Sequence, residues 1–593
     1  MDWRTLLIRN FVTLSLVLGL SSCSQESTND ELSRAAADYV FTNGIVYTMN
    51  EAQPEAEAIA VSGNRIAFVG SAADAESWIG DDTAVLDLAG KMMLPGFVST
   101  HDHIIAAAWL GSGLNLYKAK NKDDILEIVK ADAEANPDKK MIFGMGWSKE
   151  MLGGWPTAAD LDRVVTDRPV FLVDFTGHEG WLNSKALEDG NITKDTPDSN
   201  PGTIYWMRDD GGNPTGVGIE FQWTATFIAQ GGWQPDTMIP NSVAQLHATA
   251  IKGGMTTFTT PGPGTPTISD DAASLVDYQK ILEILTALDA EGELGMRAFV
   301  LPWFKVPAAD PVNTVAITAR LARKYNGDKV RAAGVKVHPE SGWLGQGAPM
   351  LEPYKGSDKQ GGFGVSPERT KALVLEANKH GLDVIIHVEG DASTRAAIDA
   401  FEASIQAGNT DARNSLHHMI WGHPDDYKRI LELGIAVNAT PQFTTTWSGQ
   451  EPTTYRLMGK ERTMTRFGLY SDLPHDGGRL ALSADYPSTP EHMIAPLYVM
   501  QTAMTLMDPD DPDSKHFPPT RKQLTLEQGL RAITIDAAWI LRMEDKIGSL
   551  EVGKYADIVI LEEDLREVDA KRIKDVKVLA TIMDGRFTHR DGI

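Results

Sequence analysis

The sequence predicts an α/β protein made of a (β/α)8 TIM-like barrel and a small β-sandwich domain formed by both ends of the chain. Three observations lead to this prediction. Short apolar runs alternate with helical stretches through the middle of the chain, polar residues recur directly after those runs, and both ends are rich in short strands. At 593 residues the chain is long enough for more than one domain.

The β-rich ends predict one composite domain of residues 38–93 and 546–593. The first strands form two hairpins, the first of which turns at Asn43-Gly44, a dipeptide typical of tight turns. The strands of this domain are expected at residues 39–48, 58–70, 558–561 and 576–583. The middle, residues 94–545, is then inserted as a separate barrel domain.

The alternation of strands and helices in the middle favours a closed barrel over an open sheet. Strands are expected at 92–98, 141–145, 170–175, 256–260, 296–301, 333–337, 384–388, 416–421, 436–439 and 480–484. Helices are expected at 275–288, 315–325, 367–380, 392–407 and 424–433. Barrel enzymes place their chemistry at the C-terminal ends of the strands. Residues 202–216, rich in Gly, Asp and Pro, are expected to form a hairpin or loop over that face.

The N-terminus has the pattern of an export signal. Arg4 and Arg9 accompany an apolar run that is too short to span a membrane, and small residues follow it. Leu20-Ser21-Ser22-Cys23 resembles the bacterial lipobox, which implies lipidation of Cys23 after removal of the preceding residues. We therefore expect a lipoprotein signal peptide at 1–23 and a flexible tether at 24–37. An ordinary signal peptide with an incidental cysteine is the alternative.

Composition limits the partners. The formal net charge of −26 argues against nucleic acid, because phosphate binding needs a basic face. Cys23 is the only cysteine, so an intramolecular disulfide is excluded. We expect an exported protein that is held to a bacterial membrane by its lipid alone and faces the periplasm or the cell exterior. The sequence leaves open whether it forms a homo-oligomer.

A His-x-His pair follows the apolar run that ends at Val98. In an extended segment alternate residues point to the same face, so His101 and His103 point together and Asp102 points away. Two neutral imidazoles on one face are half of a site for zinc or a similar divalent ion. A surface pair of histidines is the alternative.

Further polar residues lie at the ends of later strands. Each can bind a metal ion or move a proton, and in chain order they are Lys336, His387, His417, His418 and Asp485. The repetition of such residues at strand ends is stronger support for a metal site than any single member.

This order of residues resembles the amidohydrolase superfamily of metal-dependent hydrolases, and the surrounding motifs resemble the branch called amidohydrolase family 3. The resemblance runs from about residue 39 to residue 585. The supporting motifs are Met93-Leu94-Pro95-Gly96-Phe97-Val98, Gly177-His178, Pro214-Thr215-Gly216, Leu351-Glu352-Pro353-Tyr354 and Gly548-Ser549-Leu550-Glu551-Val552-Gly553-Lys554-Tyr555-Ala556-Asp557.

The resemblance implies a ligand set for one or two divalent ions, with zinc as the expected metal. His101 and His103 would hold one ion, and His387 and His418 would hold a second. His418 is chosen over His417 because the family usually has an acidic residue directly before the ligand histidine, at the position of His417 in this chain. Lys336 matches a lysine that bridges two ions as its carbamate; a free ammonium would repel a cation.

Two residues would then carry the catalysis. Asp485 matches the last-strand aspartate, which ligates metal, accepts the proton of the attacking water and can return it to the leaving nitrogen. A divalent ion lowers the pKa of its bound water to roughly 7 and polarises the substrate carbonyl. His178 could donate a hydrogen bond to the developing oxyanion or to the substrate.

Simpler roles remain open for several of these residues. Lys336 could be an ordinary strand-end lysine paired with Glu340, and His178 could be a structural histidine. His338 and His423 are interpreted as structural or surface residues. Four tryptophans could line a substrate pocket, although large aromatic residues usually belong to the core: Trp147, Trp155, Trp181 and Trp343.

The favoured function is hydrolysis of a carbon–nitrogen bond other than a peptide bond, in an amide, N-acyl, N-formyl or cyclic amide substrate. Hydrolysis of an ester or of an exocyclic amine is the alternative within enzymes, and a lipid-anchored binding protein without catalysis is the alternative outside them. The loop after Lys336 departs from the family's usual Asp-Gly, which leaves the substrate open. A barrel mouth closed by loops suits a small organic substrate.

Overall fold

The computed structural model describes residues 36–202, 204–262, 264–269, 271–305, 310–446 and 451–593. The predicted signal peptide, its lipidation site Cys23 and nearly all of the predicted tether lie outside these residues. Within the described part of the chain, no helix combines the length and the apolar character that crossing a membrane requires.

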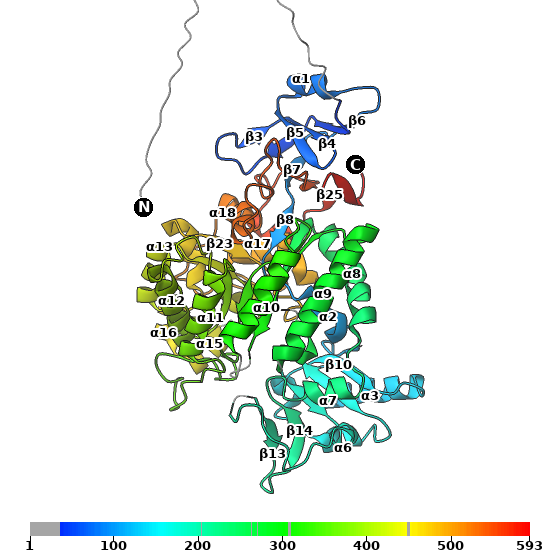
Figure 1. Cartoon of the computed structure of the whole chain (residues 1–593), viewed down its shortest axis with the longest axis vertical. Helices are drawn as coiled ribbons and strands as arrows, with labels where there is room; N and C mark the ends of the chain where they lie inside the picture. The colour runs from blue at the N-terminus through cyan, green and yellow to red at the C-terminus, as the bar shows by residue number, and fades with distance from the viewer. Residues whose placement is uncertain (1–35, 203, 263, 270, 306–309, 447–450) are drawn as a thin grey trace, which may run out of the picture.

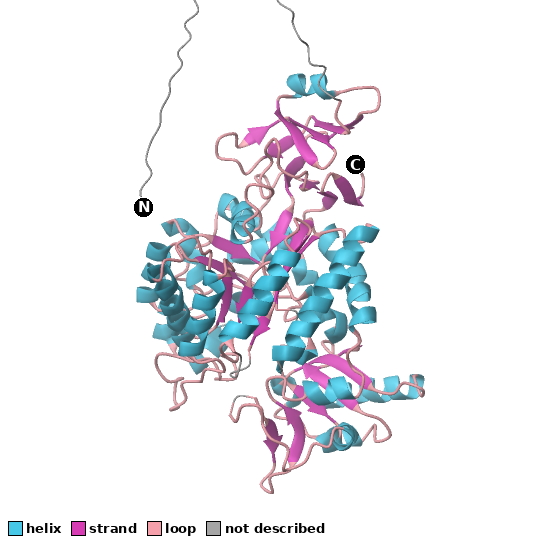
Figure 2. Cartoon of the chain, in the orientation of Figure 1, coloured by secondary structure: helices cyan, strands magenta, loops and turns pink. Residues whose placement is uncertain are grey.

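The protein has a mixed α/β fold with three parts arranged along its long axis (Figure 1). A part made mainly of strands and loops lies at one end, a central part has strands flanked by many helices, and a third part with its own strands lies at the other end (Figure 2). The central part holds the site described below.

The strand-rich part consists of two sheets, one of which combines both ends of the chain. That sheet has the order β26-β25-β24-β7-β2-β3, with β2 (Ile45–Tyr47), β3 (Glu55–Ala56), β7 (Met92–Pro95), β24 (Ile558–Leu561), β25 (Val578–Met583) and β26 (Arg586–Arg590). The other has the order β5-β4-β1-β6, with β1 (Tyr39–Thr42), β4 (Ala58–Ser62), β5 (Arg65–Gly70) and β6 (Ala84–Asp87). Apolar side chains from both sheets share one core, including Phe41, Ile59, Met93 and Ile558.

The central part contains two parallel sheets. One has the order β18-β16-β15-β8, with β8 (Phe97–Ser99), β15 (Met255–Pro261), β16 (Arg297–Leu301) and β18 (Val330–Ala332). The other has the order β17-β19-β20-β21-β22-β23, with β17 (Trp303–Phe304), β19 (Val335–Val337), β20 (Val384–Val388), β21 (Ser415–His418), β22 (Ala436–Ala439) and β23 (Leu480–Leu482). Beyond the ends of β8 and β23, Asp485 N–H donates to His101 O at 3.1 Å and His103 N–H donates to Tyr486 O at 2.7 Å.

Helices lie between these parallel strands in the sequence and follow the last of them. The principal ones are α2 (Ile104–Leu110), α8 (Pro235–Lys252), α9 (Asp271–Glu291), α10 (Pro311–Lys324), α11 (Pro367–Lys379), α12 (Asp391–Gln406), α13 (Pro424–Leu433), α17 (Pro496–Thr505), α18 (Leu526–Ala532) and α19 (Ile535–Ile540). Helix α11 illustrates how they form. Ser366 caps it by accepting from Arg369 N–H, and Leu373, Val374 and Ala377 form its buried stripe at helical spacing.

The third part is built on a six-stranded sheet that lies at the opposite end of the molecule from the terminal strands (Figure 1). Its order is β13-β14-β12-β11-β10-β9, with β9 (Leu114–Asn115), β10 (Ile142–Trp147), β11 (Val170–Asp174), β12 (Gly180–Leu182), β13 (Trp206–Arg208) and β14 (Pro214–Gly218). Strands β13 and β14 form the hairpin expected within residues 202–216.

The structure corrects the assignment of two predicted strands to the central sheet. The apolar runs at 141–145 and 170–175 do form strands, β10 and β11, but these pair with each other in the third part. A short apolar run signals a buried strand without specifying its partner. The expected strand at 92–98 is divided at Gly96 into β7 and β8, where Gly96 N–H donates to Asp557 O. A side chain at Gly96 would collide with Thr256.

Candidate metal centre

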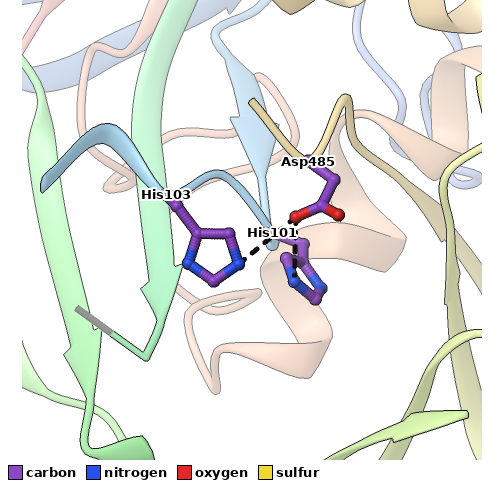
Figure 3. A group of neighbouring side chains, drawn as sticks. All are labelled: His101, His103 and Asp485. Carbon is purple, nitrogen blue, oxygen red and sulfur yellow. Dashed lines mark ion pairs between the residues drawn. The ribbon is translucent and has the colours of Figure 1, made fainter. Parts of the chain in front are cut away.

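Three predicted ligands lie together at the ends of β8 and β23. Each of His101, His103 and Asp485 offers one ligand atom, and these atoms lie within 4.8 Å of one another. Asp485 Oδ1 is 3.3 Å from Nε2 of His101 and 3.3 Å from Nε2 of His103 (Figure 3). All three residues are buried.

The local chain sets this arrangement. Asp102 points away from its two neighbours, as the His-x-His pattern predicts: it contacts Ser99 Oγ and accepts from Tyr486 N–H at 2.9 Å. It thereby ties the segment after β8 to the segment after β23. Asp485 adopts φ 58°, in the left-handed region that a residue other than glycine rarely occupies. Such strain is held by its surroundings and concentrates at functional sites.

The other predicted ligands continue the cluster. The ring of His418 lies 4.5 Å from that of His101 and 4.6 Å from that of His387, between centroids. His418 has φ 73° and its Nδ1 is 3.1 Å from Thr440 Oγ1. Lys336 lies on β19, one strand from His387 on β20. The structure thus brings His101, His103, Lys336, His387, His418 and Asp485 to one region.

Burial gives these groups the charge states that a metal site needs. It lowers the pKa of His101 and His387 well below the usual histidine range, and that of His418 to about 3, so their rings are neutral at pH 7. Burial also lowers the pKa of Lys336 to about 7. Burial alone would raise the pKa of Asp485, but the nearby imidazole of His103 and the neighbouring charges hold it below its usual value.

The donor set fits a divalent cation. Asp485 Oδ1, His387 Nε2 and Lys336 Nζ in this cluster are among the buried polar atoms of the described residues that have no hydrogen-bond partner. A buried polar atom without a partner is costly, and a bound ion would satisfy the carboxylate and the imidazole. Imidazole with carboxylate is a ligand combination typical of zinc.

Lys336 does not pair with Glu340, which was the simpler role considered for it. Glu340 accepts from Glu389 N–H and Ser393 Oγ–H, both at 2.6 Å, and is committed to the start of α12. The amine of Lys336 instead faces the histidine cluster, where its charge lowers the pKa of His101 and His387.

His178 lies at the other side of this region, in the turn between β11 and β12. The carboxylate of Asp174 shapes the turn by accepting from His178 N–H at 2.8 Å and Glu179 N–H at 2.9 Å. Nδ1 of His178 is 3.0 Å from Glu220 Oε1. The rings of His178 and His338 are 6.0 Å apart, and His338 lies against His387 with ring centroids 3.9 Å apart.

The structure adds residues that the sequence did not single out. His338, interpreted as structural or surface, is buried in the cluster, whereas His423 caps α13 by accepting from Asp425 N–H. Trp303 stacks on His103 with ring centroids 5.3 Å apart. Its position two residues after the end of β16 could have indicated this. Lys305 and Glu220 form a buried ion pair at 2.7 Å.

The tryptophans proposed for a pocket do not gather at this centre. Trp147 and Trp181 belong to the apolar core of the third part, and Trp343 belongs to an apolar cluster that the loop after β19 forms with residues 420–421 and 457–467. Trp155 is partly exposed and lies beside Trp147. Three of the four tryptophans are therefore core residues, and Trp155 is the exception.

A family model described as the amidohydrolase family matches residues 84–589, which is most of the chain. The chain belongs to the amidohydrolase family. Together with the candidate metal site, membership of this family supports a metal-binding hydrolase.

Individual relatives cover nearly the full chain. It is 28% identical over 559 residues to Protein LONG AFTER FAR-RED 3 of Arabidopsis thaliana, covering 93% of this chain and 91% of that protein. It is 25% identical over 589 residues to the N-substituted formamide deformylase of Arthrobacter pascens, covering 92% and 97%. A solved structure of an uncharacterized metal-dependent hydrolase from Pyrococcus horikoshii OT3 superposes with a TM-score of 0.69 at 21% identity, covering 90% and 99%, and this likeness concerns the fold alone.

Proposed function

We propose that this protein hydrolyses a carbon–nitrogen bond other than a peptide bond, in a small amide, N-acyl, N-formyl or cyclic amide substrate. The observation that carries the proposal is the position of Asp485 Oδ1, 3.3 Å from Nε2 of both His101 and His103, with no hydrogen-bond partner in the described chain. The similarity to an N-substituted formamide deformylase over 97% of that enzyme favours the carbon–nitrogen bond.

We infer that the site holds one or two divalent ions, with zinc as the expected metal. His101, His103 and Asp485 would hold one ion, and His387 with His418 the second. Lys336 would take part as its carbamate, because the low pKa supplies the neutral amine that adds to CO2. When bound, a divalent ion lowers the pKa of a water molecule and polarises a substrate carbonyl.

The chain's own residues would supply the proton transfer and the orientation of the substrate. Asp485 is ionised at neutral pH, so it can accept a proton from water and return it to the leaving nitrogen. Nδ1 of His178 is hydrogen-bonded to Glu220, so Nε2 is left for a hydrogen bond with the substrate. Trp303 and His338 limit the freedom of the rings beside them.

We also propose that the two central parallel sheets form one (β/α)8 barrel and that the terminal sheets form a β-sandwich. The backbone hydrogen bonds between the segments after β8 and β23 support closure, and the core shared by the terminal sheets supports the sandwich. Export and a lipid anchor at Cys23 remain proposals from the sequence. Mass spectrometry of membrane-extracted protein, with Cys23→Ser beside the wild type, tests the anchor.

The function is tested by metal analysis followed by a substrate panel. We expect one or two zinc-like ions per chain, with loss of metal in Asp485→Ala and an unchanged content in the exposed control Lys577→Ala. If the carbamate bridges two ions, Lys336→Ala loses metal as well. N-substituted formamides and N-acyl amines are then assayed beside esters and exocyclic amines. Turnover of esters or exocyclic amines alone would show that the protein is not an amide hydrolase. Metal binding without turnover of any substrate would favour a binding protein.

A further inference from the structure

His417 contacts the candidate ligand His101 from outside the metal site. It lies on β21, is fully buried, and its Nδ1 is 2.5 Å from Nδ1 of His101. Its other ring nitrogen, Nε2, is 3.1 Å from Ser415 Oγ. The residue that follows, His418, belongs to the cluster itself, so the two adjacent histidines have different surroundings.

The short distance between the two Nδ1 atoms determines the proton positions. Two imidazole nitrogens at hydrogen-bond distance must share one proton, so one donates and the other accepts. Nε2 of His101 faces Asp485, and a nitrogen that binds a metal ion must present its lone pair. His101 therefore carries its proton on Nδ1 and donates it to Nδ1 of His417. The proton of His417 is then on Nε2 and is donated to Ser415 Oγ.

A neighbouring strand holds the same segment in place. In register, His417 lies beside Asn438 of β22. The side-chain amide of Asn438 contacts Thr100 Oγ1 and donates to Ser483 Oγ at 2.6 Å. Residues of β21 and β22 thus hold both Thr100 and His101, and His417 provides the contact to Nδ1 of the His101 ring.

We propose that His417 is a positioning residue that fixes the ring and the tautomer of His101 so that Nε2 faces the divalent ion. This inference rests on the metal site of the proposed function. Groups that hydrogen-bond to the far nitrogen of a ligating histidine contribute about 10- to 100-fold to metal affinity in other proteins. His417 provides this contact as a neutral acceptor.

Zinc affinity of the full chain tests the proposal without reference to turnover. Metal-stripped wild type, His417→Phe and His417→Asn are titrated with Zn2+ against a chromophoric chelator. Phe keeps a planar ring but has no acceptor, whereas the amide oxygen of Asn can lie near the position of Nδ1. We expect roughly 10- to 100-fold weaker binding in His417→Phe and near wild-type binding in His417→Asn. The exposed histidine variant His492→Phe is the matched control and should bind as the wild type does.

The outcomes separate the two proposals. Equal affinity of wild type and His417→Phe would overturn the positioning role, as would equal losses in the Phe and Asn variants, since the loss would then follow from packing alone. If His417→Phe does not fold, Ser415→Ala decides, because it removes the group that holds the tautomer of His417: weaker binding supports the role and unchanged binding overturns it. Absence of zinc binding in the wild type would instead reject the proposed metal site.

Discussion

Nδ1 of His178 lies 3.0 Å from Oε1 of Glu220, although 42 residues separate them in the sequence. The same carboxylate accepts from Ser341 Oγ–H at 2.7 Å and pairs with Lys305 at 2.7 Å. His178 and Lys305 hold the pKa of Glu220 far below its usual value despite its burial. Glu220 is therefore an ionised group that orients His178 at the edge of the histidine cluster.

Glu220→Gln should lower kcat by roughly 10²-fold, the lower end of what a positioned proton-transfer group contributes. The neutral amide would hold His178 less firmly and leave Lys305 without its counter-charge. Steady-state kinetics on the substrate found in the panel measures the change, and zinc content should stay the same. Glu188→Gln, at an exposed glutamate, is the control. Wild-type kcat in Glu220→Gln would refute the orienting role.

Removal of metal should lower thermal stability. An ion that binds only the folded chain adds about 2.7 kcal/mol at a free concentration of 100 times Kd. Calorimetry of the wild type with and without a chelator should show a lower Tm after chelation and recovery with Zn2+. Asp485→Asn should show little response to either treatment. A wild-type Tm that does not change when the chelator is added would contradict metal binding at this site.

Lys336 should make the metal-free protein more stable as the pH rises. Its pKa is about 7 in the folded chain and about 10.5 in the unfolded chain. Between these values the unfolded state binds more protons, so the free energy of unfolding increases with pH, by at most ~1.4 kcal/mol per unit. Below pH 7 both states are protonated and the cost of the buried charge is constant.

The variant Lys336→Met isolates this effect in metal-stripped protein. The methionine should stabilise the fold most at pH 6, and its advantage should shrink as the pH rises above 7, because the wild-type lysine is then neutral when folded. Denaturant unfolding at pH 6, 7.5 and 9 measures the difference. A difference that is the same at all three pH values would indicate that Lys336 stays charged when buried.

The site could be anticipated from the sequence where a residue able to bind metal lies at or just after the end of a strand. His101, His103, Lys336, His387, His418 and Asp485 each follow or end an apolar run, and parallel strands bring such positions together. Glu220 and Lys305 could not be anticipated in this way. Their pairing depends on how the third part lies against the central strands, and local patterns carry no information about that contact.

The same limit applies to the fold. The strands at 384–388 and 436–439 have the predicted bounds, because each is a short apolar run between clear breaks. Strands β10 and β11 were recognised as strands but assigned to the wrong sheet. The sheet to which a strand belongs depends on long-range pairing, and the apolar character of a segment does not identify its partner strand. His338 directly follows β19 and is buried in the cluster, but it has no place in the order of ligands that the resemblance implies, so the sequence alone leaves it as a structural or surface residue.

The buried pair of Arg297 and Asp557 should be the main polar link between the central and terminal sheets. Arg297 lies on β16 and donates from Nε and Nη2 to the two carboxylate oxygens at 2.8 and 2.9 Å, and both side chains are almost fully buried. Asp557 also accepts from Asp584 N–H at 2.9 Å. Breaking a buried pair typically costs about 3–5 kcal/mol. Arg297 would keep a longer contact with Asp584 Oδ1 at 3.4 Å, so the loss should lie at the lower end of that range.

Asp557→Asn should therefore lower the free energy of unfolding by about that amount, measured by urea denaturation. The matched control is Asp591→Asn, since Asp591 pairs with Lys577 at 2.9 Å with both side chains about half exposed, and exposed pairs contribute little to stability. The double variant Arg297→Met, Asp557→Leu removes both charges and should recover part of the loss. If Asp557→Asn costs no more than the control, the terminal sheets are held by their apolar contacts instead.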